Sequence, residues 1–258
     1  MSAASYYAVL HYNGRDFAGW QRQARDRTAQ GEFEAALERL TTIPVTVRAA
    51  GRTDAGVHAT GQVVDFSLSK HWETGDLLRA LRATTPADMW VAKVGEAPPG
   101  FHARRDATAR RYRYVIGCDP AACSPFRHPY EWALGEQLDR SALEDSAAQL
   151  LHEHDFRAFA AVGQDKAHYQ CRVAVAEWHA RAAHEGFIFT IEADRFLHRM
   201  VRFLVGTMVD VARGRRSRED IARLLGGTSN HETSPPAPPH GLYLIGVRYP
   251  QLGEGLDS

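Results

Sequence analysis

Short stretches in which apolar residues alternate with polar ones, or run together, predict a series of strands along the chain. The first, Tyr6–Tyr12, is rich in aromatic and aliphatic residues and ends at the turn pair Asn13-Gly14. Further strands are expected at 45–49, 62–68, 90–94, 111–116, 173–178, 187–193 and 242–249.

Apolar residues at three- and four-residue spacing predict the helices. One helix is expected where Phe33, Ala36, Leu37 and Leu40 follow this spacing before Pro44. Further helices are expected around 77–81, after a capping box at Ser141 and Glu144, over 196–212, and from Ser217 to Leu225.

The order of these elements indicates the fold class. Strands that follow one another directly, such as 45–49 and 62–68, favour an α+β fold with antiparallel sheets over a doubly wound parallel sheet. The break at Pro98-Pro99-Gly100 separates two halves with a similar order of elements. We therefore expect two α/β domains, residues 1–103 and 104–258, with a cleft between them.

The composition is that of an ordinary globular protein. The 258 residues are 44% apolar and 24% charged, which excludes disorder, collagen and coiled coil. The net charge is zero, and the three cysteines form no C-x-x-C pair, so neither a disulfide framework nor a thiolate zinc site is expected. No apolar run approaches about 18 residues, and no signal-peptide pattern is present, so we expect a cytoplasmic protein without a membrane segment.

Several patterns of cofactor and metal sites are absent or incomplete. Neither the phosphate-binding loop G-x-x-x-x-G-K-[ST] nor a G-x-G-x-x-G turn occurs, so no nucleotide cofactor is expected. The segment His152–Asp155 is interpreted as the polar end of a helix, because H-x-H side chains point to different faces of a helix. No metal ion is expected.

The loop 51–58 combines two glycines, an arginine, an aspartate and a histidine between two expected strands. Glycine lets the backbone approach a ligand closely, and an arginine such as Arg52 keeps a neighbouring carboxylate ionised. An ionised Asp54 in such a loop suits nucleophilic or base chemistry. A structural turn, in which Asp54 bonds its own backbone, is the alternative that these residues leave open.

Arginines gather in two segments of the chain. Residues 104–113 hold five arginines and one aspartate, and residues 195–218 hold seven arginines and one aspartate, so the local net charges are +4 and +6. Guanidinium groups beside aromatic rings are typical of RNA recognition. On an alternating strand the ring of Tyr112 should point away from Arg111 and Arg113. A strand with one solvated, charged face is the alternative for the first segment.

These residues fall in blocks that resemble the tRNA pseudouridine synthase A family, in order from about residue 6 to residue 250. The most specific block is the octamer G-R-T-D-A-G-V-H at 51–58. The other blocks are Tyr12–Gly14, Phe17–Gln23, Gly61–Val64, Phe101–Arg104, Ala107–Tyr114, Met200–Arg202 and Gly241–Leu244. Arg199 and Phe203 depart from the residues usual in the family, and 164–170 match no pattern of it.

The resemblance implies an isomerase of tRNA processing that converts uridine to pseudouridine at positions 38, 39 and 40 in the anticodon stem-loop of tRNA. It also implies a homodimer that needs no cofactor. The implied architecture is the pseudouridine synthase fold, in which two α/β domains with antiparallel sheets meet at a central, basic catalytic cleft.

The resemblance also gives roles to residues that match its blocks. Asp54 is implied to be the nucleophile that attacks the target nucleotide and lets the base detach, turn and rejoin through C5. Arg52 is implied to help extrude the base and occupy its place. Tyr112 and Arg202 complete the implied catalytic set, Tyr112 by stacking on the flipped uracil and Arg202 by pairing with Asp54. The implied substrate-binding residues are Arg52, His58, Arg110, Arg111, Tyr112 and Leu244.

Two other functions stay open from the residues alone. A non-catalytic RNA-binding module would read a hairpin through its arginines and tyrosines, but it has no need of Asp54, whose carboxylate would weaken phosphate binding. A hydrolytic nucleosidase would release free uracil. Mapping pseudouridines in a tRNA transcript after incubation with the protein distinguishes the three.

Overall fold

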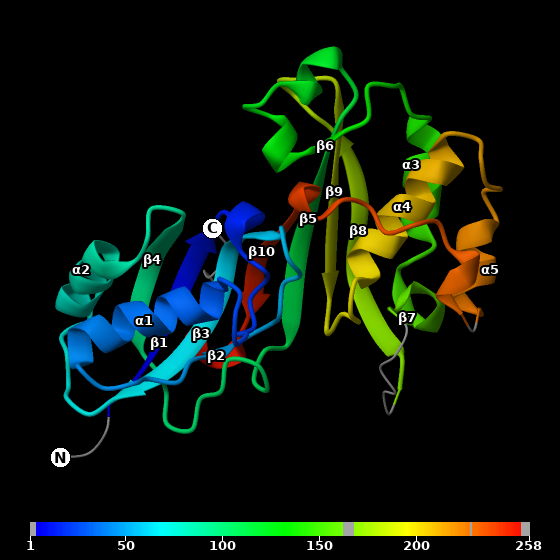
Figure 1. Cartoon of the computed structure of the whole chain (residues 1–258). Helices are drawn as coiled ribbons and strands as arrows, with labels where there is room; N and C mark the ends of the chain where they lie inside the picture. Colours follow the sequence, from blue (N-terminus) through cyan, green and yellow to red (C-terminus); the bar gives the residue numbers. More distant parts are fainter. Residues whose placement is uncertain (1–3, 162–167, 228, 254–258) are drawn as a thin grey trace. The chain divides into compact units, whose positions relative to one another are not determined.

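The computed structural model describes residues 4–161, 168–227 and 229–253 (Figure 1). The chain forms two compact units: the first holds Met1–Thr108 and Tyr243–Ser258, and the second holds Ala109–Leu242. This division differs from the expected domains 1–103 and 104–258, because the last strand of the chain pairs within the first unit. Of the segment 164–170, residues 164–167 lie outside the described residues.

The first unit is built on a mainly antiparallel sheet. Its elements are β1 (Ala4–Tyr12), α1 (Ala29–Thr41), β2 (Arg48–Ala49), β3 (His58–Leu68), α2 (Thr74–Thr84), β4 (Met89–Glu96) and β10 (Leu242–Arg248). The strand order is β4-β1-β3-β10, and the short β2 also pairs with β3. β10 is the parallel member, with Tyr243 opposite His58 and Leu244 opposite Ala59.

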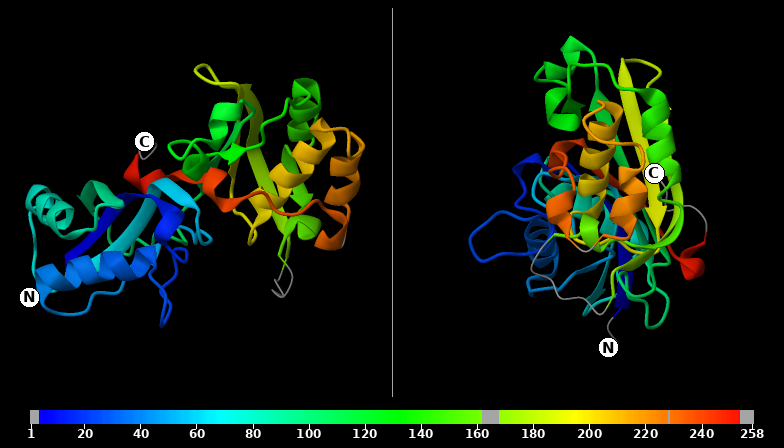
Figure 2. Two further views of the ribbon diagram at one scale, coloured as in Figure 1. Left: turned by 45° about the horizontal axis from the view of Figure 1, so that its top comes forward. Right: turned by 90° about the vertical axis from the view of Figure 1, so that its right-hand side faces the viewer.

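Helices α1 and α2 cover one face of this sheet (Figures 1 and 2). The ring of Phe33 in α1 packs edge-on against that of Phe66 in β3, with centroids 5.8 Å apart. α1 begins after a capping residue, because Oγ1 of Thr28 accepts a hydrogen bond from the N–H of Gly31 at 3.2 Å. The core of the unit therefore lies between the two helices and the central strands.

The second unit repeats this two-layer arrangement. Its elements are β5 (Ala109–Gly117), β6 (Trp132–Ala133), α3 (Arg140–Ala148), β7 (His152–Asp155), β8 (Gln170–Ala180), β9 (Gly186–Ala193), α4 (Met200–Ala212) and α5 (Asp220–Leu225). The strands β5-β9-β8-β7 pair antiparallel in that order, and β6 adds to β5 in parallel. α4 packs on β8, where the indole of Trp178 donates to the sulfur of Met208 at 3.4 Å.

The helix expected over 196–212 begins later in the structure than the sequence pattern predicts. α4 starts at Met200, because Arg199 has a φ of 61°, in the left-handed region that a right-handed helix cannot include. Phe196 therefore precedes the helix, and its ring packs edge-on against that of Tyr112 with centroids 5.0 Å apart.

Three other local expectations are corrected by the structure. His152–Asp155 is strand β7 and not a helix end, because it pairs antiparallel with β8. Of the strand expected at 45–49, only the last two residues pair with β3. The cap of α3 is Asp139, whose carboxylate accepts from the N–H of Ala142 at 3.1 Å, and not Ser141.

Both units combine a mainly antiparallel sheet with packed helices, which confirms the α+β class. In the described part of the chain, no helix is both long and apolar enough to cross a lipid bilayer. Among the same residues, no three His, Cys, Asp or Glu side chains come together in a group that could hold a metal ion.

Candidate active site

The octamer 51–58 forms the connection from β2 to β3 and ends in the first residue of β3. Asp54 and Val57 close a turn, in which the N–H of Val57 donates to the carbonyl of Asp54 at 3.1 Å. Gly56 has a φ of 78° within this turn, a conformation that glycine adopts without strain. Asp54 is half-buried and Arg52 is exposed, so both side chains lie at the surface of the loop.

Buried polar side chains hold this loop from the sheet beneath it. The phenol of Tyr12 shares a hydrogen bond of 2.8 Å with the hydroxyl of Thr53, and the amide of Gln62 donates to the carbonyl of Gly51 at 2.8 Å. Burial raises the pKa of Tyr12 to about 12, although its hydrogen bonds with Thr53 and Gln62 act in the opposite direction. The phenol is therefore neutral at physiological pH.

The segment after β1 holds the loop from a second direction. The N–H of Trp20 donates to the carbonyl of Thr53 at 3.0 Å, and the N–H of Gly56 donates to the carbonyl of Phe17 at 3.3 Å. A Cβ atom at Gly19 would lie 2.9 Å from the carbonyl oxygen of Thr53. Glycine at position 19 therefore allows the two backbones to approach this closely.

His58 is fixed below the loop. Its Nδ1 accepts a hydrogen bond from the N–H of Gly14 at 3.0 Å, and its ring stacks on that of Tyr243 with centroids 4.7 Å apart. The side chain is 2% exposed, and Leu244, next to Tyr243 in β10, is fully buried. In the structure His58 thus contacts Gly14 and Tyr243 of the same unit. Its expected contact with substrate stays a prediction.

The remaining expected site residues belong to the second unit. Tyr112 in β5 is 8% exposed, while Arg111 and Arg113 on either side are more exposed, which confirms the expected alternation. Nε of Arg111 lies 3.7 Å from the carboxylate of Glu192. Arg110 donates to the carbonyl of Asp194 at 2.9 Å.

Arg202 lies in the first turn of α4 and is half-buried. Its Nε donates to the carbonyl of Ala237 at 2.7 Å, and the N–H of Ala237 donates to the carbonyl of Arg202 at 2.9 Å. Both the main chain and the side chain of this arginine are therefore bonded to one residue of the proline-rich segment that follows α5.

The second basic segment presents less positive charge than the sequence count of +6 indicates. Carboxylates that lie outside residues 195–218 form ion pairs with several of these arginines and offset their charge. The ion pairs are Arg213 with Glu136, Arg216 with Asp220, and Arg218 with Asp139 and Asp145. Arg215 lies 3.7 Å from Asp210, and its side chain is 61% exposed.

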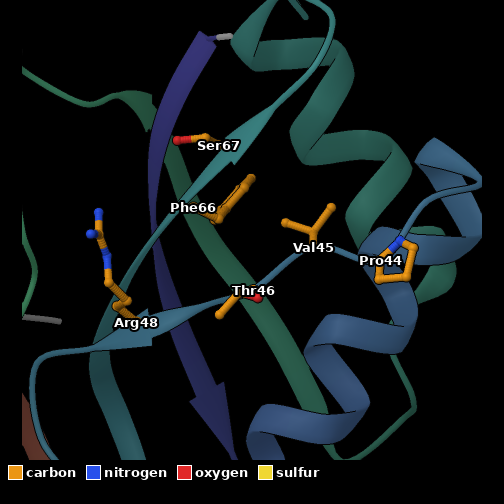
Figure 3. A pocket seen from close by; sticks show the side chains of 6 residues that line it. All are labelled: Pro44, Val45, Thr46, Arg48, Phe66 and Ser67. Carbon is orange, nitrogen blue, oxygen red and sulfur yellow. The ribbon is translucent and has the colours of Figure 1, made fainter.

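The first unit also holds a hollow of about 350 Å³ (Figure 3). It is lined by Pro44, Val45, Thr46, Arg48, Phe66 and Ser67. Arg48 is bonded to the buried carboxylate of Asp65, to which its Nε donates at 2.8 Å. None of the expected site residues lines this hollow.

The expected site residues are thus divided between the units. Arg52, Asp54, His58 and Leu244 lie in the first, and Arg110, Arg111, Tyr112 and Arg202 lie in the second. No role is predicted from the sequence for Tyr12, Trp20, Gln62 or Ala237, although each bonds the backbone or a side chain of the expected site. The first three stand within blocks of the family resemblance, which is the signal that could have identified them.

Comparison with known proteins agrees with these features. A model of the tRNA pseudouridine synthase family matches residues 8–105 and 147–250 of the chain. The tRNA pseudouridine synthase A of Moorella thermoacetica is 41% identical over 244 residues, which are 93% of this chain and 98% of that protein. The protein of the same name from Solidesulfovibrio magneticus is 39% identical over 245 residues, 93% of this chain and 89% of its own. The protein of the same name from Chlorobaculum tepidum is 37% identical over 241 residues, which are 93% of this chain and 96% of that protein.

The α+β units, the aspartate loop and these matches define the class of the protein: it is an enzyme, an isomerase. Within that class, the chain belongs to the tRNA pseudouridine synthase family. The reaction of the family is the isomerisation of uridine to pseudouridine in tRNA.

Proposed function

We propose that this chain converts uridine to pseudouridine at positions 38, 39 and 40 of the anticodon stem-loop of tRNA, with Asp54 as the nucleophile. The observation that carries the proposal is the support of the Asp54 loop. Tyr12 and Gln62 bond it from the sheet, and Trp20 bonds it from the segment after β1. A carboxylate carried by a loop that is held at several points suits a reaction that depends on exact positioning.

The proposed reaction is balanced within one nucleotide. The Asp54 carboxylate attacks the target nucleotide while the bond between N1 of the base and C1′ of the ribose breaks. The uracil turns within the site, and a bond forms between C5 and C1′ as the carboxylate leaves. C5 loses a proton and N1 gains one, so no atom is added or lost overall and no cofactor is needed.

The target base must leave the helix before it can react. Flipping a base out of a stem costs a few kcal/mol, and less at the end of a stem than in its middle. The exposed Arg52, two residues before Asp54, is suited to enter the space that the base leaves. Exclusion of water then keeps the detached uracil in the site for the second bond.

The other site residues have matching proposed roles. Tyr112 stacks on the flipped uracil and takes the proton from C5 after the base has rejoined. Arg202 pairs with the Asp54 carboxylate. Arg110 and Arg111 bind the RNA backbone. The buried His58 and Leu244 contribute to substrate binding by shaping the site from the paired strands β3 and β10.

We propose that the enzyme acts in the cytoplasm as a homodimer. A single chain of this size offers limited basic surface for both a stem and the elbow of a tRNA, particularly since several arginines of 195–218 are paired with carboxylates. Sedimentation should show a dimer at micromolar concentration. A fully active monomer at that concentration would contradict this part of the proposal.

The proposed function is tested by incubating the protein with an unmodified tRNA transcript and mapping pseudouridine at each position. We expect product at 38, 39 and 40, with no free uracil and no added cofactor. Free uracil would instead indicate a nucleosidase. Binding without either product would indicate a non-catalytic RNA-binding protein.

A further inference from the structure

The proline-rich segment Ser234–Pro239, which we name the strap, passes over α4 on its way to β10 and is orange-red in Figure 1. From Pro235 to Pro239, only Ala237 has a backbone N–H, because its four neighbours are prolines. Each proline ring also fixes φ at about −65°. The strap therefore has little conformational freedom and a single internal backbone donor.

Ala237 gives both of its backbone groups to Arg202. Its N–H donates to the carbonyl of Arg202 at 2.9 Å, and its carbonyl accepts from Nε of Arg202 at 2.7 Å. Because the guanidinium group is planar and rigid, the bond at Nε restricts the directions in which the two terminal nitrogens can point. The strap thus constrains the orientation of this arginine.

Contacts along α4 hold the strap in place. The N–H of Ser234 donates to Oγ1 of Thr207 at 3.3 Å, and Thr207 in turn donates to the carbonyl of Phe203 at 2.8 Å. A Cβ atom at Gly206 would lie 2.2 Å from the carbonyl oxygen of Pro235. Glycine is unfavourable inside a helix, but at position 206 it lets the strap lie directly on the helix backbone.

Tyr114 holds the other end of the strap. Its hydroxyl donates to the carbonyl of Pro238 at 2.8 Å, and the side chain is fully buried. Burial raises the pKa of Tyr114 well above its ordinary value, so the hydroxyl keeps the proton that it donates. A Cβ atom at Gly241 would lie 2.7 Å from Cζ of this ring, so the chain after the strap also fits closely around Tyr114.

We propose that the strap is a positioning element for Arg202, and that Gly206 and Tyr114 are positioning residues that act on catalysis through it. An arginine held at Nε can present its two terminal nitrogens to a carboxylate, which is the strong bidentate geometry of such pairs. The inference rests on the proposed pairing of Arg202 with Asp54. Its consequence is that residues remote from the substrate determine the rate of the reaction and not the affinity for tRNA.

Gly206→Ala tests the proposal, because its methyl group cannot fit against the carbonyl of Pro235 and must displace the strap. The single-turnover rate at saturating enzyme should fall roughly 10- to 100-fold, as expected for a displacement of about 1 Å, while the Kd for tRNA stays within about twofold. Gly226→Ala is the matched control in the same unit, since its Cβ atom would lie 3.7 Å from the nearest atom, the carbonyl oxygen of Arg223. Its rate should equal that of the wild type.

Tyr114→Phe is the milder variant and covers the case in which Gly206→Ala fails to fold. It removes only the hydroxyl that bonds Pro238, so the rate should fall by about threefold or more with an unchanged Kd. A double-mutant cycle with Arg202→Lys separates positioning from a general loss of stability. Lysine has no counterpart of Nε, so in that background either strap variant should change the remaining rate by less than about twofold.

Wild-type rates for both Gly206→Ala and Tyr114→Phe, or an equal loss with and without Arg202→Lys, would overturn the proposal. Failure of the proposed function has another signature: either the wild-type protein forms no pseudouridine, or Arg202→Lys and Asp54→Asn leave its rate unchanged. Hydrogen exchange at Nε of Arg202, measured by NMR on the free protein, tests the strap without activity. We expect exchange about tenfold faster in Gly206→Ala, and unchanged exchange would reject the strap whatever the reaction.

Discussion

Beneath the loop that carries Asp54, the phenol of Tyr12 and the hydroxyl of Thr53 share a hydrogen bond of 2.8 Å. Both side chains are buried, at 4% and 7% exposure. The bond joins the end of the first strand to the residue directly before the proposed nucleophile. The position of the carboxylate therefore depends on a contact between segments 41 residues apart.

Tyr12→Phe should lower the free energy of unfolding by about 1–3 kcal/mol, because it removes a partner of the buried Thr53 hydroxyl. Adding Thr53→Val removes both polar groups and should restore most of the stability. Urea unfolding of the two variants measures the difference. A double variant no more stable than Tyr12→Phe would show that the hydrogen bond is not the source of the loss.

Asp54→Asn keeps the shape of the side chain and removes its charge. If Asp54 is the nucleophile, single-turnover pseudouridine formation should fall by about 10⁴-fold or more, while tRNA binding is retained. Asp16→Asn, at an exposed aspartate of the same unit, is the matched control and should react normally. A near-normal rate for Asp54→Asn would remove this residue from the mechanism.

Tyr112→Phe and Tyr112→Leu separate the roles of the ring and the hydroxyl. Stacking on a base is worth about 1–3 kcal/mol, so the leucine variant should lose most activity. A general base contributes about 10²–10⁴-fold, so the phenylalanine variant should form the C-glycoside but release product slowly. Quench-flow measurement of how much C-glycoside intermediate accumulates distinguishes stacking from proton transfer. A fully active phenylalanine variant would exclude proton transfer, and two variants that melt lower but react normally would show a purely structural ring.

Binding of tRNA should weaken steeply with salt although the net charge is zero, with log K linear in log salt concentration. Arg110→Gln and Arg215→Gln should each flatten the slope by about one unit, as expected for one lost phosphate contact. Arg218→Gln should change it less, because Asp139 and Asp145 already neutralise Arg218. Equal slopes for all four proteins would mean that these arginines make no phosphate contact.

Stability should depend on pH through His240, which is half-buried with its ring 5.2 Å from that of His128. Burial, followed by His128 and Arg202, lowers the pKa of His240 below its ordinary 6.5, while a hydrogen bond to the backbone of Glu131 acts in the opposite direction. The unfolded chain therefore binds a proton more readily, and the free energy of unfolding falls as pH drops below about 6.5. The contribution is fully present above that pH.

His240→Gln should remove part of this acid-side loss, as seen in urea unfolding at about pH 7.5 and 5.5. Burial also lowers the pKa of His11, so His11→Gln should remove a separate part. A pH dependence that stays the same in His240→Gln would contradict the assignment.

The elements that the sequence predicted well depend on patterns within one segment. β1, β4 and β9 lie where alternation or apolar runs place them, because burial of one face needs no distant information. The prediction was wrong where a single backbone conformation or a distant partner decides the outcome. The left-handed Arg199 delays α4, and pairing with β8 makes His152–Asp155 a strand.

In the candidate site, too, local patterns were predicted and contacts between distant segments were not. The Asp54 loop was identified from its own residues, since glycines, arginine and aspartate stand within eight positions. The residues that hold this loop were not identified, because Tyr12 and Trp20 contact it only through the pairing of β1 with β3 and the path of the chain after β1. The bond between Arg202 and Ala237 likewise spans 35 residues and a helix, beyond any local spacing.

The parallel pairing of β10 with β3 has a consequence for biosynthesis. Residues 1–108 leave the ribosome first, but the last strand of their sheet is made only after the whole of the second unit. The second unit is contiguous in the chain, so it can complete its folding while the first still lacks Tyr243, the stacking partner of His58. The sheet that carries the Asp54 loop is therefore begun before the second unit is made and completed only after it.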